Sequence, residues 1–160
     1  MHITMLALGS RGDVLPCTAL GKGLKAVGHQ VRFVTFENFE PLVAAQGLDF
    51  HPIRGDVQRI LNRPDGQTLA ESGQNAFRMA RSVQRLFGVM AESFARDLSS
   101  PALWDTELIV NQLPGGLYGY DLAEKLGVPM IAAAVIPLTP TRHQPILSPP
   151  TPKCANALLS

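Results

Sequence analysis

Short, nearly continuous apolar runs alternate with amphipathic stretches along the first part of the chain. The apolar runs extend from Ile3 to Gly9, from Val31 to Phe36 and from Leu48 to Ile53, and each has the length of a strand. Apolar residues recur at helical spacing between Leu15 and Val27 and again between Asn38 and Gln46. Strands that are buried on both faces have continuous apolar sequences, and helical crossovers join parallel strands with a right-handed connection. The pattern therefore predicts three parallel strands connected by helices.

The same alternation continues in the second half of the chain. A long helix is predicted from Phe77 to Leu98, followed by a strand at Glu107 to Asn111, a helix at Tyr118 to Leu126 and a strand at Val128 to Val135. This order predicts an α/β fold with a doubly wound, mainly parallel sheet and helices on both faces, a Rossmann-like architecture. Because such sheets bind ligands outside the carboxyl ends of their strands, we expect a functional site in the segments that follow the strands. These segments are Gly9–Val14, Thr35–Asn38, Asn111–Gly116 and Val135–Arg142.

Length and composition fit one globular domain. The chain has 160 residues, of which 46% are hydrophobic and 17% are charged, and this is enough to build a core. We assign residues 1–136 to the Rossmann-like domain, and residues 137–160, which are rich in proline, to a loop or a truncated continuation. The formal net charge of +1 predicts no strong attraction to nucleic acid. The N-terminus does not resemble an export signal, so we expect a cytoplasmic protein.

The cysteines and histidines do not have the spacing of metal ligands. Cys17 and Cys154 are far apart in the sequence, and the four histidines are scattered. We therefore predict no metal site and no tightly bound cofactor.

The stretch from Gly9 to Asp13, with the sequence GSRGD, is expected to form the turn between the first strand and the first helix. Its glycines would let the backbone approach a ligand closely, and the helix that follows presents free N–H groups. Asp13 either caps the helix N-terminus or acts as a general base, and both are compatible because a carboxylate has two oxygens. Arg11 is either a solvated charge or a partner for a phosphate or carboxylate.

Other patterns leave alternatives open. Glu37 lies at the end of the second predicted strand, where a nicotinamide-cofactor domain has its ribose-binding acid, but the first turn reads G-x-x-G-D and not G-x-G-x-x-G. Phe87, Met90 and Phe94 form an apolar stripe that packs into the core, or else lines an apolar cleft for a ligand. The sequence is also compatible with a stand-alone binding module for an apolar or sugar-bearing ligand.

Several motifs in a fixed order resemble one family. The matching stretches are Gly9–Val14, Thr35–Phe39, Gly47–Phe50, Ala123–Pro129 and Pro140–Arg142. They resemble the N-terminal domain of sterol glucosyltransferases and of the related antibiotic-aglycone glycosyltransferases, called the family 28 glycosyltransferase N-terminal domain. The resemblance spans nearly the whole chain and is weaker only between Arg54 and Thr106.

The resemblance implies an architecture and an activity. Such enzymes have two facing Rossmann-like domains, the GT-B arrangement, in which the first domain mainly holds the acceptor and the second holds the nucleotide-sugar donor. The implied reaction is inverting transfer of a hexose, usually glucose from UDP-glucose, to a hydroxyl of a sterol, a lipid or another aglycone. UDP-glucose would then be a co-substrate of the protein.

The resemblance also implies roles for the residues of the first turn. The aspartate of the family's G-S-R-G-D motif is regarded as the catalytic base, and it corresponds to Asp13. Ser10 and Gly12 match positions near the donor diphosphate when the two domains close, and Arg11 between them is assigned to the same vicinity.

The acceptor side of the family is implied at two places. Thr139, Thr141 and Arg142 lie where the family's acceptor loop begins, and Met90 joins them if the apolar stripe lines the acceptor cleft. No donor-binding domain follows Ser160, so either the sequence is part of a longer protein or another chain supplies that domain. Because transfer requires donor and acceptor to be held together, we expect the isolated chain to be inactive. Peripheral contact with a membrane is left open.

Overall fold

The computed structural model describes residues 1–55, 88, 91, 93–112 and 116–135. In this part of the chain one sheet is formed by five strands, in the order β3-β2-β1-β4-β5. The strands are β1 (His2–Ala7), β2 (Gln30–Phe36), β3 (Asp49–Ile53), β4 (Leu108–Gln112) and β5 (Met130–Ala133). The helices are α1 (Arg11–Ala26), α2 (Glu40–Ala44) and α6 (Gly116–Leu126), with 3-10 turns η1 (Glu37–Phe39) and η2 (Pro101–Leu103).

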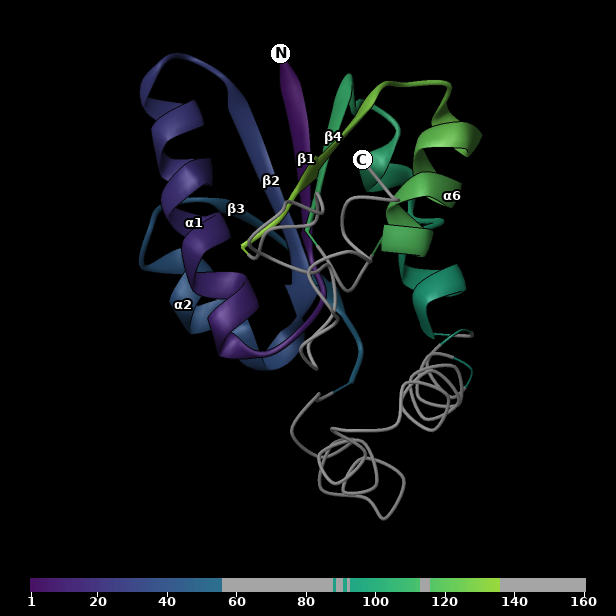
Figure 1. Cartoon of the computed structure of the whole chain (residues 1–160), viewed down its shortest axis with the longest axis horizontal. Coiled ribbons are helices and arrows are strands. Elements are labelled where there is room, and N and C mark those ends of the chain that lie inside the picture. The colour runs from purple at the N-terminus through teal and green to yellow at the C-terminus, as the bar shows by residue number, and fades with distance from the viewer. Residues whose placement is uncertain (56–87, 89–90, 92, 113–115, 136–160) are drawn as a thin grey trace, which may run out of the picture.

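All strand pairs of this sheet are parallel, and β1 lies at its centre. Ile3 of β1 is opposite Val31 of β2 on one side and Leu108 of β4 on the other. The chain moves outward from β1 through β2 to β3, and later from β4 to β5 on the other side. Because right-handed crossovers in opposite directions place their helices on opposite faces, α1 and α2 cover one face and α6 covers the other (Figure 1). The predicted doubly wound α/β fold is confirmed.

The core surrounds the central strands. Residues 3–8 are all buried, and in β2 the side chains of Phe33, Val34 and Phe36 are almost completely inaccessible. Helices contribute Val14 and Leu122 from opposite faces of the sheet. Burial on both faces explains why the sequence of β1 is nearly continuously apolar and does not alternate regularly with polar residues.

Two helices differ from the sequence predictions. Helix α1 begins at Arg11, earlier than the predicted start at Leu15, because the GSRGD turn is short and its last residues are already helical. The helix predicted from Asn38 to Gln46 is a 3-10 turn followed by the short α2, with Pro41 in the first turn of α2. Proline is accepted in the first turn of a helix but not further along, and this fixes where α2 starts.

The last predicted strand is longer than the observed one. Strand β5 pairs with β4 only from Met130 to Ala133, opposite Ile109 to Gln112, whereas the apolar pattern extends from Val128 to Val135. The described part of the long predicted helix, residues 93–97, is helical and ends as predicted before Pro101. Most of that helix, most of the loop predicted from Arg54 to Gln67, and the segment 137–160 lie outside the described residues. Within the described ranges, the helices are too short or too polar to cross a bilayer.

Charged side chains gather at the amino edge of the sheet, away from the expected site. Arg32 donates two hydrogen bonds to the Asp105 carboxylate, from Nη1 to Oδ1 over 2.5 Å and from Nη2 to Oδ2 over 3.2 Å. The hydrogen bond from Arg32 is the main reason why the pKa of Asp105 is lowered to about 2, with a smaller contribution from His2. The side chains of Arg32, His2 and Asp105 are partly exposed, so solvent screens these ion pairs and we expect them to add little to stability.

Two glycines in helices should respond oppositely to replacement by alanine. A Cβ at Gly119 of α6 would lie 2.4 Å from Cγ of the buried Asn111, whereas a Cβ at Gly23 of α1 would meet nothing within 4 Å. We expect Gly119→Ala to destabilise the chain by about 1–3 kcal/mol through overpacking. Gly23→Ala should stabilise it by about 0.5–1 kcal/mol, because glycine loses more backbone entropy in a helix. Urea unfolding of both variants measures the difference, and equal effects would contradict the packing of α6 on β4.

Candidate functional site

The carboxyl end of β1 leads directly into the N-terminus of α1. Only Leu8, Gly9 and Ser10 separate the strand from the helix, and Ser10 is the N-cap residue with extended backbone. This turn lies next to the end of β4, because Ala7 of β1 is opposite Gln112. The turn therefore occupies the edge at which doubly wound sheets bind their ligands.

Asp13 lies in the first turn of α1 and bonds back to the N-cap residue. Its Oδ2 accepts hydrogen bonds from the backbone N–H of Ser10 over 2.7 Å and from the Ser10 hydroxyl over 2.8 Å. The interpretation of Asp13 as the N-cap itself is therefore wrong. Ser10 is the N-cap, and Asp13 is the N3 residue whose carboxylate reaches back to it, as in a capping box.

Gly9 makes room for this arrangement. A Cβ at Gly9 would lie 2.4 Å from Oδ2 and 2.7 Å from Cγ of Asp13, which is closer than unbonded atoms can approach. The sequence predicts that the glycines of this turn admit a ligand. At Gly9 the group that approaches the backbone is the chain's own carboxylate.

The other oxygen of Asp13 is held from the neighbouring strand. Nε2 of Gln112, the last residue of β4, donates to Oδ1 of Asp13 over 3.1 Å. Gln112 is only 1% exposed, whereas Asp13 is partly exposed. The sequence predicts the end of this strand at Asn111 and places Asn111–Gly116 at the expected site, but it gives Gln112 no individual role. The available signal was a pair of polar residues at the end of an otherwise apolar strand.

The carboxylate of Asp13 therefore has a capping side and an open side. Oδ2 already accepts two hydrogen bonds, which is its usual capacity, and Oδ1 accepts one from Gln112. Chemically, the arrangement offers an oriented anion with capacity for one further donor, such as an alcohol, on Oδ1.

A buried thiol lies one helical turn further along α1. Cys17 is 5% exposed, and its pKa is raised to about 11, first by burial and second by the negative charge of Asp13. The thiol is therefore protonated at neutral pH and serves as an apolar side chain beneath the turn.

The remaining residues of the turn face solvent. Ser10, Arg11 and Gly12 are all exposed at the beginning of α1. Within the described part of the chain, Arg11 forms no hydrogen bond or ion pair, so its guanidinium can reach an anion that approaches the helix N-terminus. Free N–H groups and a nearby cation are the usual elements of a phosphate site.

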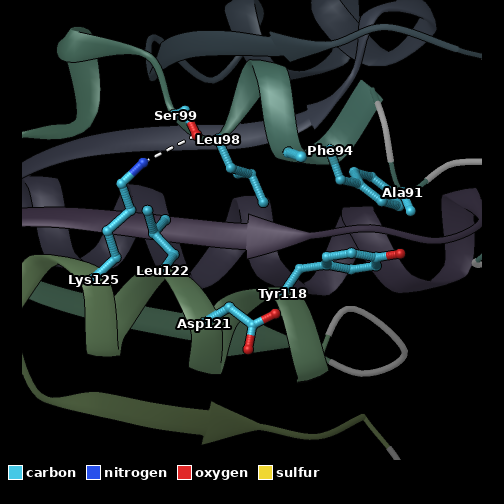
Figure 2. A pocket seen from close by; sticks show the side chains of 9 residues that line it. Ala91, Phe94, Leu98, Ser99, Tyr118, Asp121, Leu122 and Lys125 are labelled. Atoms are coloured by element: carbon cyan, nitrogen blue, oxygen red, sulfur yellow. Dashed lines mark hydrogen bonds between the residues drawn. The ribbon is translucent and has the colours of Figure 1, made fainter.

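A second feature is an apolar groove on the opposite face from α1. It encloses about 330 Å³ between α6 and the residue 93–97 helix with the turn that follows it. Figure 2 shows the side chains of both elements pointing into the space between them. The lining residues are Ala91, Phe94, Ala95, Leu98, Ser99, Tyr118, Asp121, Leu122 and Lys125.

Aromatic rings mark the end of the groove that is nearer the carboxyl edge. The ring of Phe94 lies 4.2 Å from that of Tyr118 and 6.0 Å from that of Phe36, the last residue of β2 (distances between ring centroids). Lys125 donates to the Ser99 hydroxyl over 3.0 Å at the other end (Figure 2). Burial, and secondarily the charge of Asp121, raises the pKa of Tyr118, so its hydroxyl stays protonated at neutral pH.

The structure brings together only part of the residues that the sequence singled out. Ser10, Arg11, Gly12 and Asp13 are adjacent at the carboxyl edge. Met90, Thr139, Thr141 and Arg142 lie outside the described residues. Phe94 is buried in the core and also lines the groove.

Comparison with known proteins agrees with this geometry. Residues 3–145 match the glycosyltransferase family 28 N-terminal domain. The chain belongs to this family. A sterol 3-beta-glucosyltransferase of Aspergillus terreus is 34% identical over 149 residues, which are 91% of this chain and 10% of the fungal protein. The Pichia angusta enzyme of the same name is 37% identical over 147 residues, 90% of this chain and 11% of that protein. This family 28 domain therefore spans about a tenth of these relatives.

Solved structures show the same fold in related transferases. The glycosyltransferase SsfS6 of Streptomyces sp. SF2575 aligns with a TM-score of 0.63 and 28% identity, covering 84% of this chain and 39% of SsfS6. SsfS6 complexed with thymidine diphosphate aligns with a TM-score of 0.59 and 27% identity, over 84% of this chain and 38% of the other. The family 28 domain thus shares its Rossmann-like fold with part of a GT-B glycosyltransferase.

The charge of Asp13 should be measurable at Cys17. We expect Asp13→Asn to lower the pKa of Cys17 from about 11 while leaving it above the ordinary value of 9.0, because burial is the larger cause. The pH dependence of thiol alkylation, in a Cys154→Ser background, measures this pKa. Glu124→Gln, which removes an exposed carboxylate from α6, is the control and should leave it unchanged. An unaltered Cys17 pKa in Asp13→Asn would mean that the carboxylate does not lie over this thiol.

Proposed function

We propose that the chain is the acceptor-binding half of an inverting glycosyltransferase. It would transfer a hexose, glucose from UDP-glucose, to the hydroxyl of a sterol or of a similar apolar acceptor. The observation that carries the proposal is the Asp13 carboxylate of a family 28 domain, oriented by Ser10 and Gln112 with capacity left on Oδ1.

Asp13 would act as the general base of the transfer. Its Oδ1 accepts the proton of the acceptor hydroxyl while that oxygen forms a bond to the anomeric carbon of the sugar. The bond between the anomeric carbon and the diphosphate breaks in the same displacement, and UDP leaves with the electron pair. A single displacement from the opposite side inverts the anomeric configuration. Asp13 contributes by position and charge, since the bonds from Ser10 hold its carboxylate in place.

The first residues of α1 would approach the donor diphosphate. Ser10, Arg11 and Gly12 are exposed at a helix N-terminus, where N–H groups and the dipole attract anions. The thymidine diphosphate bound by SsfS6 supports a nucleoside diphosphate as the donor group in this class of fold. A donor diphosphate at this position would bring the anomeric carbon close to Asp13.

The apolar groove would hold the acceptor body. Its volume of about 330 Å³ lies within the range of small-molecule sites, roughly 300–1,000 Å³. Its walls are mainly apolar, and Tyr118 supplies a hydroxyl near the carboxyl edge. Met90, Thr139, Thr141 and Arg142 remain our proposed acceptor contacts beyond the described residues. The sterol 3-beta-glucosyltransferase relatives support a fused-ring acceptor.

Catalysis would require a second domain to hold the donor. The chain spans about a tenth of its fungal relatives and 39% of SsfS6, so we propose that the isolated chain binds acceptor without turnover. Membership in a glycosyltransferase family makes this function preferable to the nicotinamide-cofactor hypothesis and to the stand-alone binding module.

Asp13→Asn tests the role of the base. In the active transferase that contains this domain and its donor-binding half, we expect turnover to fall by about 10²–10⁴-fold. The melting temperature should change little, because the new amide can accept from Ser10 and donate to Gln112 once the Gln112 amide rotates. Initial rates with UDP-glucose and cholesterol measure the loss. If the variant turns over at a rate close to that of the parent enzyme, Asp13 is not the general base.

Filling the groove tests the acceptor site on the isolated chain. Ala95 is exposed and lines the groove, so Ala95→Trp should weaken binding of radiolabelled cholesterol in equilibrium dialysis by at least about tenfold. Ala19→Trp places the same side chain on the exposed face of α1, across the sheet, and should leave binding intact. UDP-glucose alone should produce little heat in calorimetry. Equal cholesterol binding by both variants would place the acceptor elsewhere.

A further inference from the structure

Gln112 is buried between the end of β4 and the beginning of α1, and only one side of its amide has a partner. Nε2 donates to Asp13 Oδ1 over 3.1 Å, while Oε1 is buried and has no hydrogen-bond partner in the described part of the chain. The side chain is 1% exposed. Leaving a buried acceptor without a partner costs stability.

The buried threonine hydroxyls in and beside the sheet have hydrogen-bond partners within the protein. The hydroxyls of Thr4 and Thr106 are 2.6 Å apart and bond to each other, and Thr35 donates to the carbonyl of Ala7 over 2.7 Å. An apolar residue of similar size at position 112 would avoid the loss of stability that results from burying Gln112 Oε1 without a hydrogen-bond partner. Folding alone therefore does not account for a glutamine here, and its single contact points to the carboxylate of Asp13.

We infer that Gln112 is a positioning residue for Asp13, which holds the carboxylate from the side opposite to Ser10; this inference rests on the proposed function. Ser10 fixes Oδ2 from the turn and Gln112 fixes Oδ1 from β4, so the plane of the carboxylate is set from two elements. The second acceptor position on Oδ1 is then left for the proton of the acceptor hydroxyl.

The chemistry of the amide suits this task. Only the N–H side of Gln112 can face an ionised carboxylate, so the charge of Asp13 itself determines the orientation of the amide. The hydrogen bond from the amide fixes the position of the carboxylate oxygen Oδ1. A neutral donor does this without placing a second titrating group beside the base, whereas a glutamate at the same position would compete with Asp13 for one proton.

The test uses the active transferase with two substitutions at this position. Gln112→Met keeps the length of the side chain but removes the donor. We expect kcat to fall roughly ten- to hundredfold, as for loss of a hydrogen bond to a charged group, with KM for the acceptor unchanged.

Gln112→Glu keeps the shape and places a second carboxyl group 3.1 Å from Oδ1. The pair then retains a proton at neutral pH, so activity should fall there and recover as the pH is raised until both groups are ionised. This recovery at alkaline pH is a readout that a purely structural role would not produce. It also decides the question if Gln112→Met does not fold.

Thr4→Val is the matched control, since it removes a buried hydrogen bond at the opposite edge of the sheet. It should lower the melting temperature and leave both the pH profile and kcat unchanged. If the Gln112 variants behave in the same way, the positioning role is wrong. Asp13→Asn, assayed in parallel, separates the inference from the proposed function. If Asp13→Asn retains turnover, the proposed function is overturned. If Asp13→Asn loses turnover while the Gln112 variants keep the pH profile of the parent enzyme, only this inference is overturned.

Discussion

The parallel pairing of β1 with both of its neighbours is the constraint on which the site depends. Because β1, β2 and β4 run in the same direction and in register, all three end at one edge of the sheet. Residues far apart in the sequence, such as Asp13 and Gln112, become neighbours for this reason. Ala7 lies opposite Gln112, so a short turn after β1 brings the first turn of α1 to the end of β4.

At this edge one carboxylate serves folding and chemistry together. Oδ2 of Asp13 satisfies two donors of Ser10 at the start of α1, and the same contacts orient the group. The helix dipole supports the charge, and the buried Cys17 beneath it adds no competing anion at neutral pH. Stability and function therefore do not oppose each other at this residue, since the ionised, oriented form is also the form that stabilises the helix.

Much of the fold could be predicted from the sequence, because the central strands are covered on both faces and their sequences are mainly apolar. The position of the GSRGD turn followed from the first strand alone. The capping pattern could not be predicted, since Ser10 and Asp13 are both good N-cap residues and only the backbone conformation distinguishes them. Gln112 could not be assigned, because its partner depends on the register between β4 and β1. The groove depends on how Phe94 and Tyr118 pack across two helices, which periodicity does not specify.

The close approach of Asp13 to the backbone at Gly9 makes the residue type at one position depend on the residue type at the other. With 2.4 Å between Oδ2 and the site of a Cβ, no side chain enters position 9 while the carboxylate keeps its place. A lineage that lost the aspartate could accept alanine or serine there, but the aspartate could then not return without first restoring glycine. The order in which substitutions accumulate at this turn is thus set by space within the protein, before any substrate is considered.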